Sequence, residues 1–230
     1  MKSAPQLVPI TLEDLNSAAE VYRTVEKRAR FYDMARRLVQ AGYDVEGAAL
    51  LLAIWNTGRM RFVGSSFDVD TLEGIFCREL RDDFSHFQDS NIQNIDLKAE
   101  GARIARMFNR LSSVDGVEYT GAAKLMHLKR PELFVMWDEY IRGEKPKKLY
   151  ACLPCNTSGK WSLCRYAKSG EGYVTFLRDM QSRFHDIAYP PANSKTLAKA
   201  IDEFYYVNIT LVIQLIEDRI EKQKKAQQQK

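Results

Sequence analysis

Asp138 follows an apolar run and comes directly after Trp137 in the stretch GVEYTGAAKLMHLKRPELFVMWDEYIR, residues 116–142. An aspartate at this place can cap the short helix predicted to open with Glu139 and Tyr140, so backbone N–H groups would fix its carboxylate and keep it ionised. A carboxylate about 4 Å from a developing positive charge stabilises that charge by roughly 4 kcal/mol at an effective dielectric constant near 20. This stabilisation is worth on the order of a thousandfold in rate, and the same group can orient water.

Lys124 lies in the same stretch and offers a second kind of chemistry. A lysine amine can attack an electrophilic carbon and form a Schiff base. Structural alternatives stay open for both residues, because Asp138 could be a helix cap only and Lys124 an ordinary solvated lysine.

Two short helices joined by a tight bend must position these residues. The pattern over residues 111–128 predicts an amphipathic helix, a bend at Gly116 and Val117, and a second helix that begins near Thr120. In such a helix-hairpin-helix the bend and the second helix start direct backbone N–H groups outward, which suits a phosphate. Phosphate contacts of this kind fix register on a nucleic acid without reading its sequence.

The rest of the chain also reads as helical, with no strand alternation and no internal repeat. We therefore expect an all-α fold, a two-lobed helical bundle that forms a single domain over residues 1–230. The polar, basic segment EKQKKAQQQK, residues 221–230, is predicted to be a disordered tail. The expected helices run from Thr11 to about Tyr43, from Asp44 through 47–55, over 70–87, from Asp96 to 111, over 172–185 and 194–206, and from about 207.

Composition limits the function classes. The 230 residues carry a net charge of +4, which permits a polyanionic partner. No apolar stretch approaches the roughly 20 residues of a membrane span, and the N-terminus does not resemble a signal peptide. We expect a cytoplasmic protein with no membrane association, and nothing in the sequence indicates an obligate oligomer.

Three of the four cysteines, Cys152, Cys155 and Cys164, form a C-x2-C-x8-C cluster. A zinc or iron–sulfur site needs four ligands, and the fourth would have to be the distant Cys77 or a histidine. We therefore favour isolated thiols and expect neither a metal nor a cofactor.

The hairpin and Asp138 together resemble the helix-hairpin-helix DNA glycosylase superfamily, which includes endonuclease III, the adenine glycosylases and the archaeal 8-oxoguanine glycosylases. Gly116 and Val117 match the hairpin of that family, Ala122 matches its small residue, and Asp138, 22 residues after Gly116, matches its catalytic aspartate. The resemblance covers about residues 40–210. It implies excision of a damaged or mismatched base, with 8-oxoguanine as one candidate, from double-stranded DNA by a monomer associated with the nucleoid.

The sequence departs from the family pattern at two hairpin positions. Glu118 stands where the family has its second hairpin glycine, and Thr120 stands where lyase-competent members carry a nucleophilic lysine. Members without that lysine use water. Lys124 is one helical turn beyond Thr120, on roughly the same helix face, which makes it the candidate nucleophile here.

The resemblance also assigns residues that would hold an extruded nucleotide. The loop 55–62 would fill the gap in the duplex, with Asn56 and Arg59 as wedge or orphan-base contacts; a plain helix terminus is the alternative. Stacking residues for a base pocket would be Trp55, Trp137 and Tyr140. Three groups of residues are candidate phosphate contacts. They are Gly116, Val117 and Thr120 at the bend, Lys129 and Arg130 after the second helix, and Arg142, Lys145, Lys147 and Lys148 after Asp138.

Two other functions remain open on the sequence. Glu118 and Thr120 favour a DNA-binding module that has the fold without the activity. The modest net charge favours a helical protein–protein adaptor.

Overall fold

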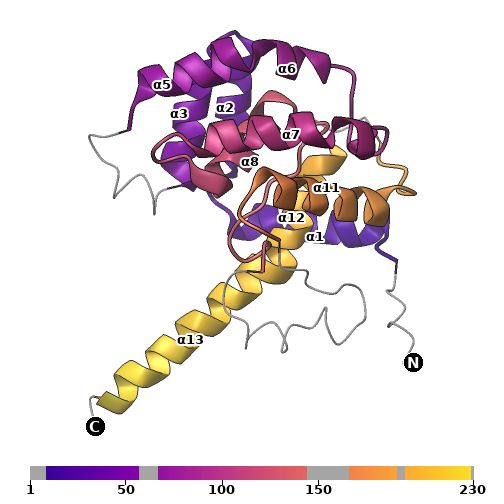
Figure 1. The fold of residues 1–230 in the computed structure, drawn as a ribbon. Helices are drawn as coiled ribbons and strands as arrows, with labels where there is room; N and C mark the ends of the chain where they lie inside the picture. The colour runs from indigo at the N-terminus through magenta and orange to yellow at the C-terminus, as the bar shows by residue number, and fades with distance from the viewer. Residues whose placement is uncertain (1–8, 57–66, 144–165, 191–194, 229–230) are drawn as a thin grey trace.

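The structure is a computed structural model that describes residues 9–56, 67–143, 166–190 and 195–228, and every regular element within these ranges is helical (Figure 1). The predicted all-α class is therefore confirmed. The helices form mostly for the reasons that the sequence indicates, namely capping side chains at helix starts and apolar residues at helical spacing.

The N-terminal part consists of α1 (Leu12–Val25), α2 (Ala29–Gln40) and α3 (Asp44–Trp55). Thr11 and Asp14 form the capping box that begins α1. The single helix expected up to about Tyr43 is divided in two, because Glu26 accepts hydrogen bonds from the backbone and side chain of Arg28 and the chain turns there. Asp44, expected as a cap, is instead the first residue of α3.

The middle part contains α5 (Val69–Glu73), the π-helical segment η2 (Gly74–Glu79), α6 (Arg81–His86), α7 (Leu97–Ser112) and α8 (Glu118–Lys129). The helix expected over residues 70–87 is thus present as three consecutive segments. Asp96 caps α7 as expected, since its carboxylate accepts from the backbone N–H groups of Lys98 and Ala99.

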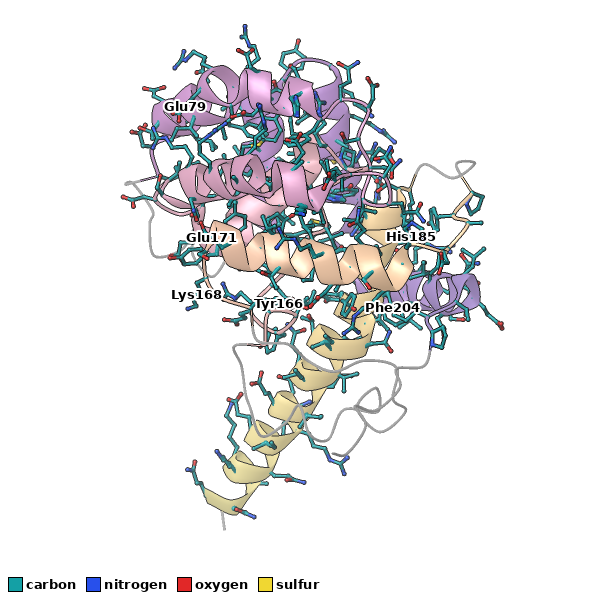
Figure 2. All side chains as sticks on the ribbon, turned by 45° about the vertical axis from the view of Figure 1, so that its right-hand side comes forward. Glu79, Tyr166, Lys168, Glu171, His185 and Phe204 are labelled. Atoms are coloured by element: carbon teal, nitrogen blue, oxygen red, sulfur yellow. The ribbon has the colours of Figure 1, made fainter. Side chains whose placement is uncertain are left out.

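The C-terminal part consists of α11 (Gly170–Phe184), α12 (Leu197–Tyr205), the π-helical segment η3 (Tyr206–Thr210) and α13 (Leu211–Gln228). Glu171 and His185 mark the two ends of α11 in Figure 2. The expectation of disorder from residue 221 is wrong for residues 221–228, where α13 continues as an exposed helix. That segment contains no Gly or Pro, and Glu221 pairs with Lys225 one turn later, so local helix propensity suffices.

The helices form two groups, with α13 extending away from the body (Figure 1). One group holds α2, α3 and α5 to α8, and the other joins α1 to α12, η3 and α13 from the far end of the chain, while α11 packs mainly on α7. A continuous buried cluster spans both groups. α7 and α11 approach each other closely at Gly170, where an added Cβ would lie 2.2 Å from the carbonyl oxygen of Ala105.

None of the helices in the described ranges is both long enough and apolar enough to cross a lipid bilayer.

Candidate active site

The bend between α7 and α8 is held from a distance by Asn56. Its side-chain amide donates to the carbonyl oxygens of Gly116 at 2.7 Å and Val117 at 3.3 Å. Gly116 has φ +83°, a conformation that glycine adopts without strain, and Glu118 has φ +48°. The helices therefore meet at the expected place, and α8 begins at Glu118, two residues earlier than the sequence suggests.

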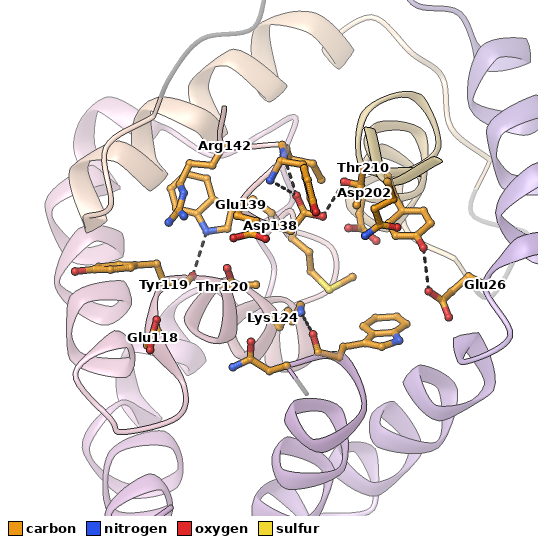
Figure 3. A pocket seen from close by; sticks show the side chains of 18 of the residues that line it. Glu26, Glu118, Tyr119, Thr120, Lys124, Asp138, Glu139, Arg142, Asp202 and Thr210 are labelled. Carbon is orange, nitrogen blue, oxygen red and sulfur yellow. Dashed lines mark hydrogen bonds between the residues drawn. The ribbon is translucent and has the colours of Figure 1, made fainter. Parts of the chain in front are cut away.

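Asp138 follows the buried Trp137 and directly precedes a turn, and three hydrogen bonds hold its carboxylate (Figure 3). Oδ1 accepts from the backbone N–H groups of Tyr140 at 2.9 Å and Ile141 at 2.8 Å. Oδ2 accepts from the hydroxyl of Thr210 at 2.7 Å. The predicted capping bonds are present, although residues 139–143 form turns rather than a helix.

The protonation of Asp138 differs from the sequence-based expectation. Burial raises the pKa of its carboxyl group, although the hydrogen bonds from Ile141 and Thr210 and the charge of Lys124 each act to lower it. The hydrogen bonds therefore fix the carboxylate without holding its pKa below the usual range.

Lys124 is buried on α8, where its side chain is 9% exposed. Its Nζ donates to the carbonyl oxygen of Trp55 at the end of α3. Burial lowers the pKa of Lys124 to about 8, and the negative charge of Asp138 limits this decrease. A substantial fraction of this amine is consequently neutral at mildly alkaline pH, as a nucleophilic lysine requires.

Asp138 and Lys124 both line one cavity of about 650 Å³. This volume is within the range of small-molecule pockets and exceeds that of a single nucleobase. We call it the Asp138 cavity. Further lining residues are Tyr22, Glu26, Arg28, Trp55, Asn56, Glu118, Tyr119, Thr120, Met136, Trp137, Glu139, Tyr140, Ile141, Arg142, Lys168, Asp202, Tyr206, Thr210 and Gln214.

All three aromatic residues predicted to form a base pocket, Trp55, Trp137 and Tyr140, line the Asp138 cavity, but they differ in solvent exposure. Trp55 is partly exposed and its ring is parallel to that of Tyr32, with centroids 5.6 Å apart. Tyr140 is half-buried and its hydroxyl donates to Glu217. Trp137 is 1% exposed, and its indole N–H donates to the carbonyl oxygen of Tyr119, so it is mainly a core residue.

Two residues expected to contact DNA are buried instead. Asn56 is 7% exposed, and because its amide binds the bend carbonyls it is placed as a structural tie rather than as a wedge. Arg142 is 4% exposed, and its guanidinium lies over the rings of Trp137 at 5.6 Å and Tyr119 at 5.9 Å. A surface phosphate contact does not fit either placement.

Lys129 and Arg130 lie at the opposite end of α8 from the bend, which is a correction to their expected place beside a phosphate track. Lys129 is the last residue of α8, roughly 16 Å along the axis from Glu118. Its Nζ pairs with Asp44 at 2.5 Å, and Arg130 donates to the carbonyl oxygen of Phe84 at 2.5 Å. Both side chains join α8 to the helices that cover it.

Other predicted residues lie outside the described ranges, namely Arg59, Lys145, Lys147, Lys148 and the cysteines Cys152, Cys155 and Cys164. Within the described ranges no group of three or more His, Cys, Asp and Glu side chains has the arrangement of a metal site.

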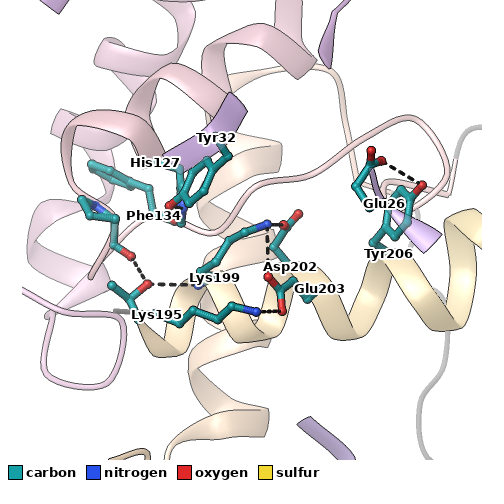
Figure 4. A network of polar contacts seen from close by, with 11 residues as sticks. Glu26, Tyr32, His127, Phe134, Lys195, Lys199, Asp202, Glu203 and Tyr206 are labelled. Atoms are coloured by element: carbon teal, nitrogen blue, oxygen red, sulfur yellow. Dashed lines mark hydrogen bonds and ion pairs between the residues drawn. The ribbon is translucent and has the colours of Figure 1, made fainter. Parts of the chain in front are cut away.

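Sequence reasoning missed the residues that α1, α12 and η3 bring to the Asp138 cavity, which are Glu26, Asp202, Tyr206 and Thr210. Asp202 accepts from the buried Lys199 at 2.6 Å (Figure 4). The ammonium group of Lys199 lies within 5.1 Å of the ring centroids of Tyr22, Tyr32 and Trp55.

Burial alone would lower the pKa of Lys199, but Asp202, followed by Tyr22 and Glu203, outweighs it and raises that pKa well above its usual value. The i, i+3 and i, i+4 spacing of Lys199 with Asp202 and Glu203 was the only sequence signal for this cluster.

Comparisons of the chain with protein-family models, curated proteins and solved structures find no match. The resemblance seen in the sequence stays a prediction, so the function has to be inferred from the Asp138 cavity itself.

Proposed function

We propose that this protein is a DNA glycosylase that cleaves the N-glycosidic bond of a damaged or mismatched base in double-stranded DNA. The observation that carries the proposal is that Asp138 and Lys124 line the same cavity. One is a carboxylate fixed by three donors, and the other is a buried amine whose pKa is lowered to about 8.

Asp138 would act on the sugar. As the bond between C1′ and the base nitrogen breaks, its electron pair leaves with the base and positive charge develops on the sugar. A carboxylate near that charge stabilises it, and burial strengthens the effect because water is excluded. In the hydrolytic reaction a water molecule adds its oxygen to C1′ and gives up its proton to Asp138. The upward direction of the Asp138 pKa shift suits this proton transfer, since a base works best with a pKa close to the ambient pH.

Lys124 would allow strand cleavage in addition to base release. Its neutral amine can attack C1′ in place of water, displace the base and form a Schiff base with the opened sugar, after which the strand can break by elimination. The hydrogen bond from Lys124 to the carbonyl oxygen of Trp55 would hold the amine at the cavity wall before it attacks C1′.

The target nucleotide must leave the base stack to reach the Asp138 cavity, at a cost of a few kcal/mol. Trp55 and Tyr140 are the candidate stacking residues for the extruded base, because both are partly exposed at the cavity. On this proposal the protein acts as a monomer on nucleoid DNA in the cytoplasm, and 8-oxoguanine is the first base to test.

A cleavage panel tests the proposal. Labelled duplexes with one 8-oxoguanine, uracil, hypoxanthine, alkylated adenine or thymine opposite guanine would be incubated with the protein and analysed with and without alkali. The variants are Asp138→Asn and Lys124→Gln, and the matched control is Lys98→Gln, a change at an exposed lysine on α7.

Cleavage that needs alkali and is lost in Asp138→Asn would support a water-using glycosylase. Cleavage without alkali, together with a borohydride-trapped complex that is lost in Lys124→Gln and kept in Lys98→Gln, would support Lys124 as the nucleophile. Absence of base release from every duplex would overturn the enzymatic proposal.

A DNA-binding module without activity is the second candidate, and Glu118 favours it. Glu118 is the first residue of α8, directly after the bend, and a carboxylate there opposes the approach of a phosphate. Salt-dependent duplex binding without base release would support this candidate, and absence of duplex binding would favour a protein–protein adaptor.

A further inference from the structure

The C-terminal helix reaches the Asp138 cavity through a π-helical turn. α12 passes into η3 (Tyr206–Thr210) and then α13 without leaving a helical path. A π turn carries one residue more than an α turn, which rotates the helix that follows by about 100° relative to an uninterrupted one. The side-chain amide of Asn208 donates to the carbonyl oxygen of Phe204 at 2.8 Å within this widened turn.

The two ends of η3 both contact acidic groups of the Asp138 cavity. The hydroxyl of Tyr206 donates to Glu26 at 3.2 Å, and the hydroxyl of Thr210 donates to Oδ2 of Asp138 at 2.7 Å. Thr210 is 2% exposed, so bulk water does not replace its hydroxyl easily. π turns occur frequently at functional sites, and here the turn accounts for two contacts between segments far apart in the sequence.

We propose that Thr210 is a positioning residue that fixes the orientation of the Asp138 carboxylate for the reaction, so that the root of α13 is part of the catalytic site. The backbone of the turn at residues 139–141 holds only Oδ1. Rotation about the Cβ–Cγ bond moves both oxygens, so the bond from Thr210 to Oδ2 gives the carboxylate a second fixed point and opposes its reorientation. This inference rests on the proposed function of Asp138, but the bond itself can be tested without DNA.

Two substitutions separate the hydroxyl from the shape of the side chain. Thr210→Val replaces the hydroxyl by a methyl group of similar volume, and Thr210→Ser keeps the hydroxyl and removes the methyl group. Thr175→Val is the matched control, because Thr175 is an exposed threonine on α11 whose hydroxyl binds a helix carbonyl. Should Thr210→Val fail to fold, Thr210→Ala and Thr210→Ser give the same comparison.

The first measurement is an NMR titration of the full chain with 13C-labelled aspartate carboxyl groups, with the Asp138 signal assigned by its loss in Asp138→Asn. The hydrogen bond from Thr210 favours the ionised carboxylate, so its loss in Thr210→Val should raise the titration midpoint of Asp138. Thr210→Ser and Thr175→Val should keep the midpoint of the parent protein. An unchanged midpoint and chemical shift in Thr210→Val would overturn the inference.

The second measurement is base release from the duplex that the parent protein cleaves best. We expect kcat to fall roughly tenfold in Thr210→Val at neutral pH, because hydrogen bonds to charged groups are the stronger ones, while duplex affinity stays the same. The acid limb of the pH–rate profile should move to higher pH, and Thr210→Ser should restore it. An unchanged kcat and profile would overturn the positioning role. If the parent protein releases no base, the proposed function and with it the catalytic role fail, while the NMR titration still decides whether Thr210 holds Asp138.

Discussion

The side-chain amide of Asn56 donates to the carbonyl oxygen of Gly116 at 2.7 Å, although the two residues are 60 positions apart in the sequence. This bond joins the end of α3 to the bend before α8, and Lys124 makes a second connection between the same helices through the carbonyl oxygen of Trp55. The end of α3 thus sets the positions of both the bend and the candidate nucleophile.

Replacing Asn56 by Ala should therefore act on stability. The change removes both bonds from the Asn56 amide and leaves the carbonyl oxygens of Gly116 and Val117 without that donor, so the free energy of unfolding should fall by about 1–3 kcal/mol. Urea denaturation measures the loss, and the exposed Gln40→Ala is the control. A strong loss of duplex affinity at unchanged stability would instead favour the wedge role that the sequence suggests.

Schiff-base formation by Lys124 should depend on pH. Its pKa in the folded protein is about 8, against 10.5 as the usual value, so the neutral amine increases about tenfold per pH unit up to about pH 8 and then levels off. Borohydride trapping between pH 6 and 9 measures this rise. Trapping that is independent of pH, or unaffected by Lys124→Gln, would exclude Lys124 as the nucleophile.

The lowered pKa of Lys124 also predicts that the stability of the folded protein depends on pH. Because the folded pKa of Lys124 is lower than the unfolded one, the unfolded chain holds more protons between pH 8 and 10.5. The contribution of Lys124 to the free energy of unfolding should therefore rise with pH across this window. Denaturation of the parent protein and of Lys124→Met at pH 8 and pH 10 should show a difference between them that grows in favour of the parent.

Lys129→Met should weaken the fold and leave DNA binding unchanged. The variant loses the ion pair with Asp44, whose Oδ1 atom is buried without a hydrogen-bond partner in the described structure, and about 1–3 kcal/mol of stability should be lost. The slope of duplex affinity against salt concentration should stay the same. A slope that decreases by about one unit would show that Lys129 contacts a phosphate after all.

Lys199→Met should be the most destabilising of these changes. It leaves the carboxylate of Asp202 without its ion-pair partner and removes the ammonium group from the rings of Tyr22 and Trp55, so a loss of about 3–5 kcal/mol is expected. Thermal and urea denaturation measure it. The double variant Lys199→Met with Asp202→Leu should recover part of the loss, and no recovery would mean that the ring contacts dominate.

Local sequence rules predicted most of the helices. Thr11 and Asp96 begin their helices as their side chains indicate, because a cap depends only on residues two or three positions away. The same rules missed the division at Glu26 and the helical continuation of α13, since Glu26 also binds the distant Tyr206 and the continuation depends on marginal propensities.

The sequence alone determined the all-α class, the bend at Gly116 and the capped carboxylate of Asp138, because each depends on backbone geometry within a few residues. From the sequence, Lys124 was expected to be a nucleophile and Lys129 a phosphate contact, both beside the bend. Only the tertiary structure buries Lys124 beside the Asp138 cavity and pairs Lys129 with Asp44. It alone brings Thr210 to Asp138, across 72 positions of sequence, because such contacts arise from the packing of helices that no local pattern relates to each other.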